Sequence, residues 1–250
     1  MRAGTVAWNL REWVGGFHVR CILFVAFLIG AAWLSGAPAH AALLGSTEQV
    51  RTGTETTGRW SAMLARVGHV ADPCAPPLIP VSLAEARPDE APAAAPAAAA
   101  AAPACRSGEA TDELRAVAKQ ATALPILERV RLINAAANRR PYVTDKINYG
   151  AEDYWATLDE FAARGGDCED YAIAKYMLLK AAGVAPEAMR IAVVYDLTLN
   201  ASHAVLGVDV GGTTYILDNQ VDEVLPDGEV GYYQPVYSVN ERGWWLHMPA

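Results

Sequence analysis

The sequence predicts an α+β protein in which helices come first and an antiparallel β-sheet follows. Between residues 110 and 181, apolar residues recur at spacings of three and four, as on one face of a helix. From residue 189 onward the pattern changes to β-rich runs separated by glycines. Because the helices are grouped before the strands, the order favours an α+β arrangement over alternating βαβ units.

Residues 1–41 have the pattern of a secretory signal peptide. The apolar run Cys21–Leu34 follows two arginines and is closed by small residues that end at Ala39-His40-Ala41. This run is shorter than the roughly 20 residues that cross a bilayer. We therefore expect cleavage before Ala42, export, and a single domain over residues 42–250; a retained membrane anchor is the less favoured alternative.

The charge of the chain argues against nucleic acid as a partner. The formal net charge is -8, and it becomes -10 without residues 1–41, which hold three arginines and one glutamate. Such an acidic protein lacks the positive charge that binds phosphate backbones.

Three cysteines follow the predicted cleavage site: Cys74, Cys105 and Cys168. The first two flank a Pro/Ala-rich insertion at about residues 75–104, which has no periodic apolar face. A disulfide between Cys74 and Cys105 would close this insertion and stabilise the fold by about 3–4 kcal/mol. That pairing leaves Cys168 as a free thiol.

Two or three helices are expected before the loop that leads to Cys168. Residues 57–67 carry apolar side chains at helical spacing, and residues 110–139 read as two helices or as one helix with a kink at Pro125. The second helix is predicted to bury Ile126, Val130, Ile133 and Ala137. Residues 140–166 are rich in turn signals and are predicted to form a loop.

A core helix is predicted to begin at Cys168. Asp167 suits the N-cap position, with Asp170 three places on, and an apolar stripe runs from Tyr171 to Ala181 and ends at Gly183. Cys168 therefore lies in the first helical turn.

The strands are predicted at residues 189–197, 203–210 and 213–219, with one or two more at 231–246. A two-residue turn at Gly211-Gly212 sets the register of the hairpin. It places His203 and Asp218 on the same face as diagonal neighbours, within reach of a hydrogen bond.

Cys168, His203 and Asp218 form a candidate catalytic triad. A helix N-terminus and a nearby imidazole both lower the pKa of a thiol, and a carboxylate orients the imidazole. Taken singly, each residue is more often a packing or turn residue. Together they favour nucleophilic catalysis, and one Cys with one well-placed His leaves a zinc site short of ligands.

Several motifs resemble one known family. They are Gly165-Gly166-Asp167-Cys168-Glu169-Asp170-Tyr171, Asp153-Tyr154-Trp155-Ala156-Thr157, His203-Ala204-Val205-Leu206 and Leu217-Asp218-Asn219, together with Asn134, Asn138 and Tyr142-Val143-Thr144-Asp145. This set resembles the bacterial transglutaminase-like cysteine proteinases, which include periplasmic adhesin-releasing proteases of the LapG type. Leu158 departs from the proline often found there, and the insertion at 75–104 is also a departure.

The resemblance implies a papain-like or transglutaminase-like fold and a periplasmic cysteine endopeptidase with Cys168, His203 and Asp218 as its triad. It also implies calcium bound by Asp167, Glu169 and Asp170, although a helix N-terminus favours such carboxylates without any metal. The implied substrate is a large surface adhesin whose cleavage controls biofilm attachment. The implied regulator is an inner-membrane cyclic-di-GMP receptor.

Two other functions remain open. The same fold and first half-reaction would serve a protein-crosslinking acyltransferase, in which an amine intercepts the acyl-enzyme. A non-enzymatic binding module would instead use the insertion and the acidic surface to recruit a partner.

Overall fold

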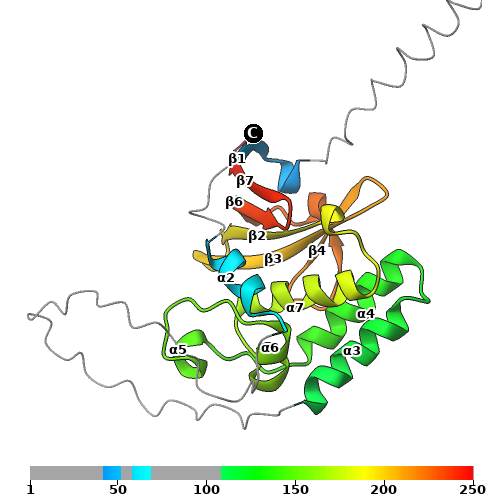
Figure 1. The fold of residues 1–250 in the computed structure, drawn as a ribbon. Coiled ribbons are helices and arrows are strands. Elements are labelled where there is room, and N and C mark those ends of the chain that lie inside the picture. The colour runs from blue at the N-terminus through cyan, green and yellow to red at the C-terminus, as the bar shows by residue number, and fades with distance from the viewer. Residues whose placement is uncertain (1–41, 52–57, 69–107, 250) are drawn as a thin grey trace, which may run out of the picture. The chain divides into compact units, whose positions relative to one another are not determined.

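The computed structural model describes residues 42–51, 58–68 and 108–249. In these residues the α-helices gather on one face of a seven-stranded sheet (Figure 1). The predicted signal peptide, the insertion and the Cys74–Cys105 disulfide lie outside the described residues. None of the helices in the described ranges is long and apolar enough to cross a membrane.

The helices confirm most of the pattern that the sequence predicts. Two helices, not one kinked helix, follow the insertion, because Pro125 takes the N-cap position of the second one with extended backbone. Ile126 is 36% exposed, so its predicted burial is wrong, whereas Val130, Ile133 and Ala137 are buried. The helices are α2 (Gly58–Arg66), α3 (Glu109–Ala121), α4 (Ile126–Asn138), α5 (Asp145–Asn148), α6 (Leu158–Arg164) and α7 (Cys168–Ala181).

The prediction of a loop over residues 140–166 is wrong in two places, since α5 and α6 form there. Helix α6 begins with a capping box: the Thr157 hydroxyl accepts from the Glu160 amide, and the Glu160 carboxylate accepts from the Thr157 amide. The sequence signal for this start was the Thr-x-x-Glu spacing. Seven residues are too few to show an apolar period, so glycines and proline dominated the pattern.

Helix α7 is the centre of the structure. It packs against α3, α4 and α6 on one side and against β2 and β3 on the other. Most of its residues are therefore buried all round, among them Ile173, Ala174 and Leu178. A helix enclosed in this way is a rigid support for the residue at its first position.

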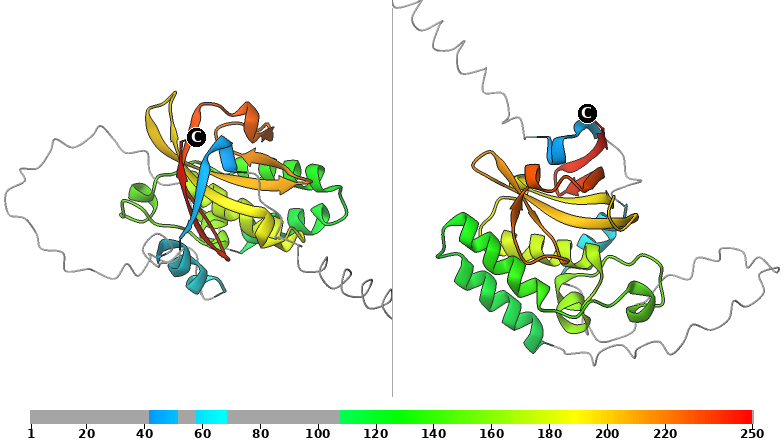
Figure 2. Two further views of the ribbon diagram at one scale, coloured as in Figure 1. Left: turned by 90° about the horizontal axis from the view of Figure 1, so that it is seen from above. Right: turned by 180° about the vertical axis from the view of Figure 1, so that it is seen from behind.

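The sheet is antiparallel throughout, with strand order β1-β7-β6-β2-β3-β4-β5. The β3–β4 hairpin turns at Gly211-Gly212 and pairs Val210 with Thr213, which confirms the predicted register. Figure 2 shows β1 and β7 side by side at one edge. The strands are β1 (Thr47–Arg51), β2 (Met189–Asp196), β3 (Ala201–Val210), β4 (Thr213–Leu217), β5 (Leu225–Pro226), β6 (Tyr233–Asn240) and β7 (Gly243–Met248).

Candidate active site

Cys168 is the first residue of α7 and is a free thiol. Asp167 is the N-cap, and Asp170 completes a capping box by accepting from the Asp167 amide at 3.3 Å. The other oxygen of Asp170 accepts from the Ala156 amide at 2.7 Å, which ties the preceding loop to the helix start. A Cβ on Gly166 would lie 2.3 Å from Asp170 Oδ2, so only glycine leaves room for this turn.

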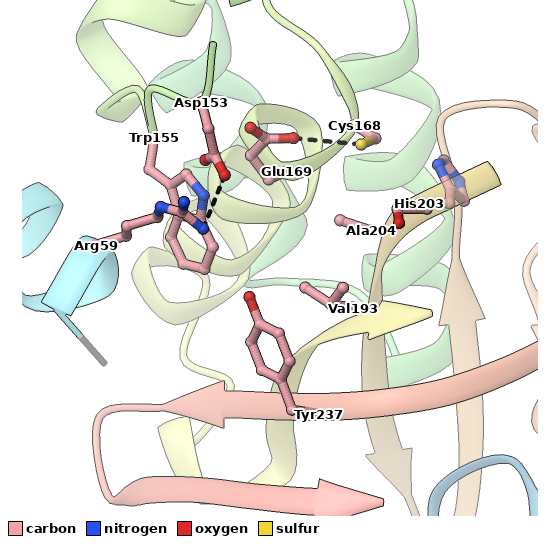
Figure 3. A pocket seen from close by; sticks show the side chains of 10 residues that line it. Arg59, Asp153, Trp155, Cys168, Glu169, Val193, His203, Ala204 and Tyr237 are labelled. Carbon is pink, nitrogen blue, oxygen red and sulfur yellow. Dashed lines mark hydrogen bonds and ion pairs between the residues drawn. The ribbon is translucent and has the colours of Figure 1, made fainter. Parts of the chain in front are cut away.

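The thiol faces a cavity of about 310 Å³ that is lined by the start of α7 and by residues of β2, β3 and β6 (Figure 3). Cys168 and His203 both line it, so α7 and β3 bring these two predicted residues to one site. Apolar and charged side chains that sequence reasoning did not assign to the site share the cavity. They include Arg59, Asp153, Trp155, Val193 and Tyr237.

His203 and Asp218 form the hydrogen bond that the hairpin register predicts. His203 Nε2 lies 2.9 Å from Asp218 Oδ1, and both side chains are buried. The Gln220 amide donates to Asp218 Oδ1 at 2.9 Å, and the Tyr233 hydroxyl donates to Oδ2. Burial alone raises the pKa of Asp218, but the hydrogen bond and charge of His203, together with the hydrogen bonds from Gln220 and Tyr233, outweigh it and lower that pKa below its ordinary value.

The thiol of Cys168 makes its hydrogen bond to a carboxylate. Its Sγ donates to Glu169 Oε2 at 3.2 Å. Burial, and then the negative charge of Glu169, raise the pKa of the Cys168 thiol well above its ordinary value, although the Ala204 amide opposes this by donating to the sulfur. Burial and the charge of Glu169 therefore outweigh the expected lowering of this pKa by the helix N-terminus and favour the protonated thiol.

Acidic side chains crowd the start of α7. Asp167 and Glu169 lie with the thiol in one group of possible ligand atoms, and Asp167 and Asp170 lie with Asp145 in another. Asp145 was not predicted as a site residue. With Asp153 it also forms a group around Glu169, and the atoms of each group lie within 4.8 Å of one another.

Burial disfavours the ionised form of the carboxyl groups in this cluster. It raises the pKa of Asp145 to about 7 and that of Glu169 to about 8, and it raises the pKa of Asp170 well above its ordinary value. Asp145 Oδ1 and Asp167 Oδ1 are buried without a hydrogen-bond partner in the described ranges. Oxygen donors with raised pKa values and open lone pairs fit a hard divalent cation.

Comparison with solved structures finds LapG of Legionella pneumophila, which is 33% identical with a TM-score of 0.51; the match covers 56% of this chain and 81% of that one. An EGTA-treated structure of the same protein is 33% identical with a TM-score of 0.51, and the match covers 56% of this chain and 79% of that one. A calcium-bound structure of LapG is 31% identical with a TM-score of 0.49, and the match covers 56% of this chain and 88% of that one. A search of curated proteins finds no match.

A family model described as bacterial transglutaminase-like cysteine proteinase matches residues 96–249. This match spans more than half of the chain and includes α3 to α7 and strands β2 to β7. The mixed helix and antiparallel sheet arrangement agrees with a transglutaminase-like fold. The chain therefore belongs to the bacterial transglutaminase-like cysteine proteinases and is a cysteine peptidase.

Proposed function

We propose that the chain is an endopeptidase in which Cys168 is the nucleophile, His203 the general base and Asp218 the residue that orients the base. The observation that carries this proposal is the placement of Cys168 and His203 in one cavity, with His203 Nε2 engaged by Asp218. Because Nε2 is engaged by Asp218, we assign Nδ1, which lies 3.5 Å from the Gln220 side-chain amide, as the nitrogen that accepts the thiol proton.

The reaction follows from these roles. The thiolate of Cys168 attacks the carbonyl carbon of a peptide bond, and the imidazolium of His203 then returns its proton to the leaving amine. The Cys168 amide has no intrahelical acceptor in the first turn of α7, so it is able to donate to the developing oxyanion. Water then enters, gives its proton to His203 and releases the acyl group from the sulfur.

Calcium dependence is the second part of the proposal, and it rests on this chain's own carboxylates. Asp167, Glu169 and Asp170 are the residues expected to hold the ion, and Asp145 is close enough to join them. A bound cation would supply positive charge that offsets theirs. The negative charge of Glu169 would then favour the protonated thiol of Cys168 less strongly, and thiolate formation would be easier.

The biological setting is proposed from the family resemblance. We place the domain formed by residues 42–250 in the periplasm after removal of the signal peptide. Its proposed substrate is a large surface adhesin, so that cleavage would release cells from a biofilm. Its proposed regulator is an inner-membrane receptor for cyclic-di-GMP that binds the protease.

Incubation of purified residues 42–250 with candidate adhesin fragments, with and without calcium, tests the activity. Mass spectrometry should find two fragments whose masses sum to the substrate plus one water, and Cys168→Ala should yield none. A fluorescent amine and a glutamine-bearing protein are added in parallel. A product heavier than its substrate contradicts the protease proposal and supports the crosslinking acyltransferase; an intact phenotype with Cys168→Ala supports the binding module.

A further inference from the structure

The cavity that holds the thiol has a second charged group at some distance from the triad. Arg59 lines this cavity, and its Nη1 lies 2.7 Å from Asp153 Oδ2. Figure 3 shows this ion pair and Trp155 on one side of the cavity and Cys168 on the other. A peptide whose carbonyl carbon is placed at Cys168 would therefore bring a neighbouring part of its chain to the guanidinium of Arg59.

Contacts other than this ion pair hold helix α2 in place. Trp60 and Met63 are buried in the main apolar core, and the Trp60 ring lies edge-to-face with the Tyr176 ring, with 5.2 Å between their centres. At the end of α2, the Arg66 guanidinium donates to the Trp155 carbonyl. An exposed ion pair adds little to stability by comparison. Docking of the helix therefore does not explain a charged pair at the cavity.

The guanidinium of Arg59 keeps donors for a further acceptor. Its side chain is 57% exposed, and that of Asp153 is 36% exposed. Burial raises the pKa of Tyr237, and the charge and a hydrogen bond of Arg59 oppose this, so the guanidinium also meets the phenol of Tyr237. A guanidinium has more N–H donors than one carboxylate and one phenol can accept, and it stays charged at any working pH. This side of the cavity thus offers both positive charge and hydrogen-bond donors.

Helix α2 precedes residues 96–249, the part of the chain that matches the family. Arg59 therefore reaches the cavity from outside the segment that carries Cys168, His203 and Asp218. A residue in this position gives the chain a means of selecting a substrate without any change in the reacting groups.

We propose that Arg59 is a substrate-binding residue, which donates hydrogen bonds to an oxygen acceptor of the peptide beside the scissile bond. Asp153 holds the guanidinium at the cavity, and Trp155 and Tyr237 form the adjoining walls. An acidic side chain and a main-chain carbonyl both offer this acceptor chemistry, and the experiment distinguishes them. The inference rests on the proposed role of Cys168 as the nucleophile.

Two alkylating reagents of different charge test the inference without a known substrate. The rates at which iodoacetate and iodoacetamide label Cys168 are measured at pH 7 in calcium, for the wild type and for Arg59→Gln. Both reagents react with the same thiolate, so the ratio of the two rates cancels any difference in thiol activation. Loss of the guanidinium should lower the rate for the anionic reagent, relative to the neutral one, by about threefold to fivefold. An unchanged ratio contradicts the inference.

Arg115→Gln is the matched control. The Arg115 side chain is also 57% exposed and pairs with Asp159 at 2.8 Å, but it is not among the described residues that line the cavity. Its ratio of rates should coincide with that of the wild type, and its melting temperature should be close to that of Arg59→Gln. An equal fall of the ratio in both variants would mean that only the net charge of the protein matters, which contradicts the inference.

A mixture of synthetic peptides of known sequence then identifies the acceptor. For each peptide that the wild type cleaves, mass spectrometry follows the product, and KM should rise about tenfold in Arg59→Gln with kcat little changed, because a binding contact is lost. A rise confined to peptides with an acidic residue beside the cleaved bond assigns the acceptor to a side chain, and a rise for all peptides assigns it to the main chain. An unchanged KM for every peptide contradicts the inference.

Arg59→Lys decides the question if Arg59→Gln does not fold. It keeps the charge but loses the planar pair of donors, so the ratio of labelling rates should stay near that of the wild type while KM rises. Wild-type values of both quantities in Arg59→Lys contradict a role for the hydrogen bonds of the guanidinium. A wild-type protein whose Cys168 reacts with iodoacetamide no faster than a free cysteine instead contradicts the proposed function.

Discussion

The acidic cluster at the start of α7 should make the protein less stable as pH rises in the absence of divalent cations. Burial raises the pKa of Glu169 from 4.5 to about 8 and that of Asp145 from 3.8 to about 7. At a pH between the ordinary pKa and the raised pKa of each group, the folded state holds a proton that the unfolded state has released. The free energy of unfolding therefore falls as pH rises from about 4 to 8.

The expected size of this effect follows from the pKa differences. One pKa unit is worth about 1.4 kcal/mol, and the pKa of Glu169 differs by about 3.5 from its ordinary value. Partial exposure of this side chain lets solvent screen the charges, so we expect about 2 kcal/mol. For a domain of this size, that corresponds to a fall in melting temperature of about 4–8 °C.

The assay is thermal unfolding of residues 42–250 in a chelator between pH 5 and pH 8.5, followed by fluorescence. Glu169→Gln should make the fall in melting temperature with pH less steep, which separates the contribution of this residue from those of other titrating groups. The control is Glu152→Gln, since Glu152 is exposed and pairs with Lys146 at the surface. Calcium should restore the melting temperature at pH 8. A melting temperature that stays constant or rises with pH in chelator would refute the reasoning.

Three further substitutions give independent checks. Asp218→Asn should reduce kcat by about 1000-fold or more with KM little changed, because the His203 tautomer is no longer fixed; progress curves on a peptide substrate measure this. Tyr233→Phe removes one donor to Asp218 and should lower kcat about tenfold, and an unchanged kcat would show that the hydroxyl is not needed. Phe161→Ala empties a fully buried site and should lower the free energy of unfolding by about 3–5 kcal/mol in urea titrations, whereas a value under about 1 kcal/mol would mean that the core around α6 is loosely packed.

The sequence predicted the elements that depend on local signals. The cap at Asp167 and the apolar stripe after it predicted the start of α7, and the two glycines at 211–212 predicted the register that joins His203 to Asp218. Strand β1 escaped prediction because its five residues are nearly all exposed and show no alternation. Its place in the sheet depends on pairing with β7, almost 200 residues later.

The site was only partly predictable because some of its contacts also join residues that are far apart in the sequence. Asp145 lies 22 residues before Asp167, and the two meet because the Asp145 amide donates to Asp167 Oδ2 at 3.1 Å. Arg59 reaches the cavity from α2 and pairs with Asp153 at 2.7 Å. The hydrogen bond from Cys168 to Glu169 could not be expected either, because the balance between burial and the helix N-terminus depends on the folded surroundings.

The most direct test of the proposed triad is the rate of iodoacetamide labelling of Cys168 at pH 6 in calcium, compared between the wild type and His203→Ala. If the imidazole activates the thiol, the wild type should label much faster than a free cysteine, and the variant should lose this advantage. Chelation should slow the wild type. Equal labelling rates for the wild type, the variant and a free cysteine would contradict the assignment of Cys168 and His203 as nucleophile and base.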